Sequence, residues 1–257
     1  MSSSRVTAMS ELLCLRDVCK TYVSGGTRLE VLKDVSLKVG EREIVAVVGA
    51  RYEGKTTLTQ IAAGMQRPDR GEVWFRGREL SGLSDGTRER LLGLETAWVD
   101  RNGPGLRLTV RDYVGLPLAM GHRHGKREVR KLAYEALERV GASDCARQPW
   151  EDTSRWQRVL VGLARGIACR PRLLVIDDLL DALGVRRTRQ AGELLRSAVD
   201  DLGCGLLMSV SDFEAALVAD RVWSFERGGL KLMSDQIAGE ADVIDIEGVR
   251  QGRDRAP

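Results

Sequence analysis

The chain has 257 residues, of which 43% are hydrophobic, 30% charged and 5% aromatic. This length allows one large domain or two small ones, and the composition is that of a folded globular protein, which excludes a peptide hormone and a long disordered chain. The 40 basic and 37 acidic residues are interspersed and give a net charge of only +3, so charge indicates no nucleic-acid partner. No stretch approaches the roughly 18 apolar residues of a membrane span, and the N-terminus lacks the apolar core of a secretory signal. We therefore expect a cytoplasmic protein.

The first third of the chain alternates apolar and polar residues as strands do, over 12–18 and 30–39. The run 44–48 is short, β-branched and free of charge, which is typical of a fully buried parallel strand. A turn containing glycine follows it, and the pattern then becomes helical over 55–64. Segment 71–80 predicts a hairpin arm.

From residue 84 to 166 the pattern is mostly helical, with the clearest helices expected over 88–94 and 126–140. A second buried strand, 173–176, ends in two aspartates. Helices and strands then alternate over 186–202, 205–210, 212–219 and 221–225. This alternation predicts an α/β fold with a parallel sheet, into which 84–166 is inserted as a helical subdomain.

The five cysteines are odd in number and lack the spacing of a metal site, so we expect buried, reduced thiols. They are Cys14, Cys19, Cys145, Cys169 and Cys204.

One segment between the buried strand 44–48 and the helix start fits the pattern G-x-x-x-x-G-K-[ST]. It reads Gly49-Ala50-Arg51-Tyr52-Glu53-Gly54-Lys55-Thr56. The backbone N–H groups of such a loop point at a phosphate, Lys55 adds a positive charge, and the Thr56 hydroxyl can ligate Mg²⁺. The competing interpretation is a glycine-rich turn without a ligand.

Asp177 ends the strand 173–176, and a carboxylate at the carboxyl end of a parallel strand faces such a phosphate site. On its own this aspartate is weak evidence. Together with the loop at 49–56 it predicts a P-loop NTPase.

Over residues 11–233 the sequence resembles the ATP-binding subunit of ABC transporters, which leaves 234–257 as a C-terminal tail. Tyr22 matches the family's adenine-stacking aromatic, and the run 161–165 matches the helix before the acidic strand. Segment 106–118 is similar to the branch that serves lipoprotein release and macrolide export. The resemblance implies a P-loop NTPase parallel-sheet core, an N-terminal antiparallel β-subdomain and an inserted α-helical subdomain at about 84–166.

The resemblance also implies ATP and Mg²⁺ as cofactors. Tyr22, the loop 49–56 and Thr57 would hold the nucleotide, and Thr56, Asp177 and Asp100 the metal. The expected partners are an integral-membrane permease subunit on another chain and a second ATP-binding subunit, in a homodimer or heterodimer. In such a head-to-tail pair, Ser154 and Gln157 of one subunit approach the ATP held by the other. The expected location is peripheral, at the inner face of the cell membrane.

The sequence departs from the family pattern at positions that sense the γ-phosphate. Asp178 and Ser211 stand where the family has its catalytic glutamate and its switch histidine, and Arg155 and Trp156 replace the two glycines of the signature. Tyr52 replaces a small residue, Asp100 a glutamine and Gly184 an aspartate. Because Lys55, Thr56 and Asp177 remain, we interpret the chain as one that keeps nucleotide binding and has weak or absent hydrolysis.

Three alternatives stay open. A regulatory or structural ATP-binding module would keep the fold without transport, and the absence of a membrane partner encoded nearby would favour it. A soluble P-loop kinase is disfavoured because it has no use for the run 161–165. For Asp100, direct Mg²⁺ ligation and a solvated loop aspartate facing the membrane subunit are both open.

Overall fold

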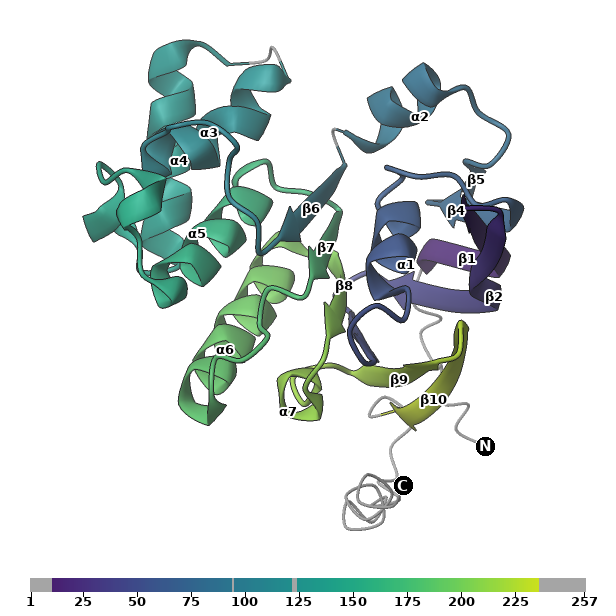
Figure 1. Ribbon diagram of the computed structural model, residues 1–257. Coiled ribbons are helices and arrows are strands. Elements are labelled where there is room, and N and C mark those ends of the chain that lie inside the picture. Colours follow the sequence, from purple (N-terminus) through teal and green to yellow (C-terminus); the bar gives the residue numbers. More distant parts are fainter. Residues whose placement is uncertain (1–10, 94, 122–123, 236–257) are drawn as a thin grey trace, which may run out of the picture.

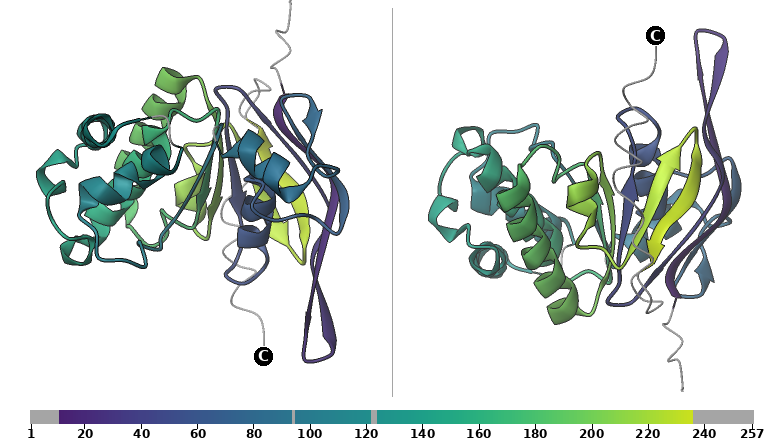
Figure 2. Two further views of the ribbon diagram at one scale, coloured as in Figure 1. Left: turned by 90° about the horizontal axis from the view of Figure 1, so that it is seen from above. Right: turned by 90° about the horizontal axis from the view of Figure 1, so that it is seen from below.

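The computed structural model describes residues 11–93, 95–121 and 124–235, and it contains two sheets with helix α1 (Lys55–Ala62) packed between them (Figure 1). The first sheet is antiparallel, in the order β2-β1-β4-β5. Its strands are β1 (Glu11–Ser24), β2 (Thr27–Gly40), β4 (Arg70–Phe75) and β5 (Arg78–Glu79). The first two strands form a long hairpin that extends past the rest of the molecule (Figure 2). This sheet confirms the predicted antiparallel β-subdomain.

The second sheet has the strand order β10-β9-β3-β8-β7-β6. Five strands are parallel, namely β3 (Ile44–Val48), β6 (Thr96–Asp100), β7 (Leu173–Asp177), β8 (Gly205–Val210) and β9 (Arg221–Glu226), and β10 (Gly229–Asp235) is antiparallel to β9. The loops that follow the parallel strands therefore gather at one edge of the sheet, where α/β proteins bind their ligands.

Strand β3 is apolar throughout because both of its faces are buried. Ile44 and Ala46 belong to the core under the larger helices, whereas Val45 and Val47 belong to the core on the side of α1. Successive side chains of a strand point to opposite faces, so alternate side chains of this five-residue run pack into two different cores. This rigid strand leads directly into the glycine-containing loop.

The helices α3 (Val110–Met120), α4 (Lys126–Arg139) and α5 (Arg155–Ala168) pack together beside the parallel sheet, and α6 (Val185–Leu202) and α7 (Phe213–Ala216) share the same core (Figures 1 and 2). Short 3₁₀ helices lie at Ser143–Cys145 and Trp150–Asp152. Helix α2 (Asp85–Leu92) stands apart from this group, on the side of the antiparallel sheet.

The boundaries expected for the helical insertion differ from those observed. Strand β6 lies inside the range 84–166 but pairs in parallel with β7, so it belongs to the main sheet. The helices that pack together start only at Val110, and α5 continues to Ala168. Among the described residues no helix combines the length and the apolarity needed to span a bilayer. The predicted tail, 234–257, starts within β10, and its part from 236 onward lies outside the described residues.

Candidate phosphate-binding site

The loop of residues 49–54 joins β3 to the first turn of α1 at the carboxyl edge of the parallel sheet. Gly54 has a φ of +115°, and a Cβ at this position would lie 2.5 Å from Cγ1 of Val31. Only glycine fits this backbone and this close approach. Tyr52 also has a positive φ, +68°, although it carries a fully exposed side chain. A non-glycine residue in this region is strained, and such strain concentrates at functional sites.

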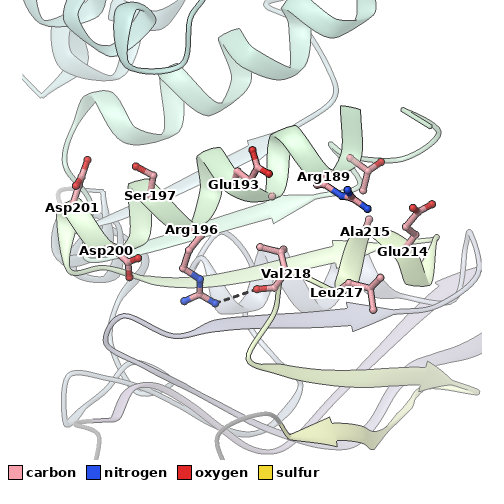
Figure 3. A pocket seen from close by; sticks show the side chains of 12 residues that line it. Arg189, Glu193, Arg196, Ser197, Asp200, Asp201, Glu214, Ala215, Leu217 and Val218 are labelled. Carbon is pink, nitrogen blue, oxygen red and sulfur yellow. Dashed lines mark hydrogen bonds between the residues drawn. The ribbon is translucent and has the colours of Figure 1, made fainter. Parts of the chain in front are cut away.

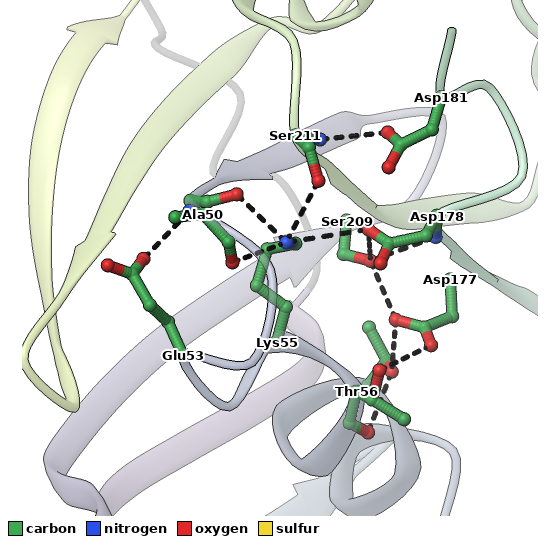
Figure 4. A network of polar contacts seen from close by, with 11 residues as sticks. Ala50, Glu53, Lys55, Thr56, Asp177, Asp178, Asp181, Ser209 and Ser211 are labelled. Atoms are coloured by element: carbon green, nitrogen blue, oxygen red, sulfur yellow. Dashed lines mark hydrogen bonds and ion pairs between the residues drawn. The ribbon is translucent and has the colours of Figure 1, made fainter.

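Lys55 is buried, and its ammonium connects the loop to the ends of two strands (Figure 4). It donates to the carbonyl oxygens of Gly49 at 2.8 Å and Ala50 at 2.9 Å, and to Oγ of Ser211 at 3.2 Å. Oδ1 of Asp178 lies 3.5 Å away. A buried ammonium needs such partners to offset its lost hydration. The lysine is therefore held between the loop and the ends of β7 and β8.

Asp177 is buried at the end of β7 and accepts three hydroxyl hydrogen bonds. The donors are Thr56 at 2.7 Å, Thr59 at 3.1 Å and Ser209 at 2.7 Å. Thr59 and Ser209 escaped the sequence analysis because no motif marks them. The structure thus brings together Thr56 and Asp177, as the sequence predicts, and they offer the hydroxyl and carboxylate oxygens that Mg²⁺ prefers.

The residues that are present fit a magnesium ion held jointly with a nucleotide. No group of three or more histidine, cysteine, aspartate or glutamate side chains able to hold a metal exists within the described part of the chain. Mg²⁺ is commonly bound by one or two protein ligands together with phosphates and water. Thr56 and Asp177 would supply the protein ligands in such a site.

Asp178 and Ser211 lie beside the Lys55 ammonium. The pKa of the Asp178 carboxyl is raised above its usual value, chiefly by burial. The Lys55 ammonium lowers this pKa, whereas the negative charges of Asp181 and Asp177 raise it. The backbone N–H of Ser211 donates to Oδ1 of Asp181 at 2.9 Å, while Oδ2 of Asp181 is buried without a partner in the structure. The sequence analysis missed Asp181, whose only signal is a charge in the segment after β7.

Tyr22 stands beside the start of α1. Its hydroxyl donates to Oε1 of Gln66 at 2.9 Å and lies 3.4 Å from Oγ1 of Thr57, while 37% of the residue is exposed. An exposed ring next to the phosphate loop can stack on a base, so this position is compatible with the predicted adenine contact. Thr57 itself is buried in the first turn of α1.

Glu53 and Asp100 both form hydrogen bonds with residues close to them in the chain. The Glu53 carboxylate accepts the backbone N–H of Ala50 at 2.8 Å, so its side chain braces the loop and points away from Lys55 (Figure 4). Asp100 lies opposite Asp177 in the sheet register, but its carboxylate accepts the backbone N–H of Asn102 at 3.2 Å and the Asn102 side-chain amide at 2.6 Å. Aspartate readily forms such local turns. The direct Mg²⁺ ligation considered for Asp100 stays a prediction.

Ser154 and Gln157 bond to each other and do not line the pocket at the phosphate loop. The Ser154 hydroxyl accepts from the Gln157 backbone at 3.3 Å, and Oε1 of Gln157 accepts from the Ser154 backbone at 2.8 Å, which is a capping box at the start of α5. Arg155 donates to the Asp181 carbonyl, and Arg187 lies 5.8 Å from the ring centroid of Trp156. The start of α5 is thus occupied by contacts within the chain.

A pocket of about 300 Å³ opens at the phosphate loop. Its lining comprises Val31, Arg51, Tyr52, Gly54, Lys55, Thr56, Thr57, Arg101 and Asp178. Arg101 was missed by the sequence analysis, and its signal is a basic residue directly after a strand end.

A larger hollow of about 810 Å³ lies between α6 and α7 and shares no residue with this pocket (Figure 3). There Arg196 is already bound to the Val218 carbonyl at 3.1 Å and to Asp220 at 2.8 Å.

A parallel strand, a glycine-containing loop and a helix that together present an ammonium, a hydroxyl and a carboxylate at one sheet edge define a P-loop NTPase. The model of the ABC transporter family matches residues 32–181, and the chain belongs to this family. The predicted family and the predicted fold class are thereby confirmed.

Known proteins of this family are similar along most of the chain. Methionine import ATP-binding protein MetN 1 of Rhodococcus jostii (strain RHA1) is 34% identical over 216 residues, which cover 83% of this chain and 63% of that relative. Lipoprotein-releasing system ATP-binding protein LolD of Francisella tularensis subsp. holarctica (strain OSU18) is 27% identical over 223 residues, covering 86% and 96%. The dimeric post-hydrolysis structure of the ATP-binding cassette MJ0796 with ADP and Pi matches with a TM-score of 0.80 at 25% identity, covering 88% and 99%.

Proposed function

We propose that this chain is the ATP-binding subunit of an ABC transporter, which binds Mg-ATP and drives or regulates integral-membrane permease subunits on other chains. One arrangement at the carboxyl edge of the sheet carries the proposal. Lys55 donates to a carbonyl oxygen of the loop, and the adjacent Thr56 donates to the Asp177 carboxylate. The similarity to a methionine import subunit and to a lipoprotein-release subunit supports it. The chain would act at the inner face of the cell membrane beside its permease.

The chain would work as a pair of ATP-binding subunits, either two copies or one copy with a related subunit. The similarity to a dimeric cassette that holds ADP and Pi supports this arrangement. Hydrolysis is expected to be weak because Asp178 and Ser211 replace longer functional side chains and because Arg155 and Trp156 fill the start of α5. The same replacements favour regulation of a permease over rapid turnover by this subunit.

The proposal is tested by the affinity for Mg-ATP of the Lys55→Ala variant. Charge-assisted hydrogen bonds to phosphate contribute about 1.5 to 3 kcal/mol, so we expect affinity to fall by about 10- to 100-fold. Isothermal titration calorimetry gives the two dissociation constants, and thermal unfolding verifies that the variant folds. Lys131→Ala is the matched control, because its ammonium is exposed on α4, away from the pocket. Equal affinities for wild type and Lys55→Ala would show that the loop is only a structural turn.

A further inference from the structure

Two arginines line the phosphate pocket although they come from separate parts of the chain. Arg51 is the third residue of the loop after β3, and Arg101 directly follows β6. Both side chains are exposed, and both residues line the pocket with Lys55 and Asp178. Within the described residues neither guanidinium has a hydrogen bond or an ion pair, whereas Arg76, Arg196 and Arg221 each form ion pairs. These two arginines are therefore available to a ligand.

The charge balance of the pocket favours a polyanion. Its lining contains three basic side chains, those of Arg51, Lys55 and Arg101, and one acidic side chain, that of Asp178. Lys55 is already engaged by two carbonyl oxygens and lies 3.5 Å from Asp178. The unopposed positive charge thus resides on the two arginines. A planar guanidinium can bind phosphate oxygens through two parallel hydrogen bonds.

The position of the arginines indicates which phosphate they reach. Tyr22 lies beside Thr57 and marks the end of the site that a base would occupy, whereas Asp178 and Ser211 surround the Lys55 ammonium at the other end. Arg101 and Asp178 follow the paired residues Asp100 and Asp177 of two neighbouring strands. Arg51 follows Ala50, whose carbonyl accepts the same ammonium. Both arginines therefore belong to the end of the pocket farther from the base.

We propose that Arg51 and Arg101 bind the terminal phosphate of a nucleoside triphosphate and make the site select triphosphates over diphosphates. This inference rests on the proposed nucleotide-binding function. Ser211 is neutral, so the positive charge at this end of the pocket comes from Lys55 and the two arginines. One arginine comes from the loop after β3 and the other directly follows β6, and both bind the terminal phosphate. A diphosphate held by the loop and the start of α1 lacks the group that they contact.

The test compares Mg-ATP and Mg-ADP affinities of the wild type with those of Arg51→Ala and Arg101→Ala, measured by calorimetry. We expect each substitution to weaken ATP on the order of tenfold and ADP by less than about twofold. Higher salt should shrink the ATP effect, because the side chains are exposed and their charges are screened. Arg130→Ala is the matched control, because this arginine is exposed on α4 and does not line the pocket. It should leave both affinities unchanged.

The remaining outcomes separate this inference from the function on which it rests. Unchanged ATP affinity in both arginine variants, with a loss in Lys55→Ala, would overturn the arginine assignment and leave the proposed function standing. Equal losses for ATP and ADP would also overturn it, because the arginines would then act on an inner phosphate. A wild-type chain that binds neither nucleotide would overturn both proposals.

Discussion

Cys204 lies directly before β8 with no exposed surface, and burial raises the pKa of its thiol from 9.0 to about 11. As the pH rises, the unfolded chain loses this proton first. The thiol therefore contributes stability that is fully present below about pH 9 and is lost as the pH rises to about 11. We expect the free energy of unfolding to fall by on the order of 2 kcal/mol across this range through this group.

The contribution of Cys204 is isolated by comparing how the free energies of unfolding of the wild type and of Cys204→Ala depend on pH. Cys204→Ala should be less stable than the wild type at neutral pH, because it leaves a small cavity. Its stability should fall less steeply between about pH 9 and about pH 11, and urea unfolding at several pH values measures both slopes. The other ionising groups are common to both proteins, so the difference between the slopes belongs to Cys204. Parallel slopes would show that the thiol does not titrate on unfolding.

The site residues that the sequence identifies are those whose role follows from local spacing. Lys55 and Thr56 belong to one loop pattern, and Asp177 ends a recognisable buried strand. Arg101 and Asp181 escape such an analysis because their relevance arises only when separate strands bring them to one edge. Strand β6, which ends at Asp100, was not expected, and the contact of Asp100 with the side-chain amide of Asn102 could not be foreseen from the sequence.

Helix α5 begins at Arg155, and its first turn contains no acidic residue. The capping box of Ser154 and Gln157 therefore satisfies N–H groups that would otherwise lack partners. We expect Ser154→Ala to lower the free energy of unfolding by about 1 kcal/mol. The ATP affinity of the isolated chain should not change, because Ser154 does not line the pocket. Chemical denaturation and calorimetry measure the two quantities.

The control for the α5 prediction is Ser197→Ala. Ser197 is exposed inside α6 and caps no helix, so its replacement should leave stability unchanged or slightly raised. A Ser154→Ala variant with wild-type stability and weaker ATP binding would contradict the prediction and identify the hydroxyl as a ligand of its own chain's nucleotide.

Elements with a strong hydrophobic pattern are predictable from the sequence, whether one face is buried, as in β2, or both faces, as in β3. The runs at 44–48, 173–176 and 205–210 are apolar because both faces are covered, and they form β3, β7 and β8. Strand β6 (Thr96–Asp100) lies at the edge of the sheet, where only Val99 is fully buried. Its sequence therefore lacks the continuous apolar run, and the strand was absorbed into the expected helical insertion.

At the scale of the molecule, the expected nucleotide contacts and the expected hydrolytic positions lie side by side at the carboxyl edge of the parallel sheet. Lys55 at the start of α1 donates to the carbonyl oxygen of Gly49 in the loop, and the neighbouring Thr56 donates to Asp177 at the end of β7. Asp178 and Ser211, which stand at the positions expected to serve hydrolysis, follow β7 and β8 and lie 3.5 Å and 3.2 Å from the Lys55 ammonium. With aspartate and serine at these two positions, Lys55 still donates to the two loop carbonyl oxygens and Thr56 still donates to Asp177. The architecture thus allows binding to persist while turnover declines.

We expect the isolated chain to bind ATP but to hydrolyse it far more slowly than a family member with the usual side chains. Asp178 is one methylene shorter than glutamate, so a general base would stand about 1 Å short of the attacking water. Ser211 supplies no positive charge for the developing charge on the phosphate. Each of these losses costs on the order of 10²-fold, so little turnover should remain. Steady-state phosphate release, with Lys55→Ala as the background control, measures the rate.

The restoration of activity provides the stricter test of the same idea. Asp178→Glu alone should fail to restore the rate, since Ser211, Arg155 and Trp156 still impair the same transition state. Combining it with Ser211→His and with glycine at positions 155 and 156 should raise the rate by more than the product of the single effects, because these groups act together on one reaction step. The combined variant must retain ATP affinity, which excludes a gain through binding. Rapid hydrolysis by the wild type that Lys55→Ala abolishes would refute the expectation of weak turnover and leave the family membership untouched.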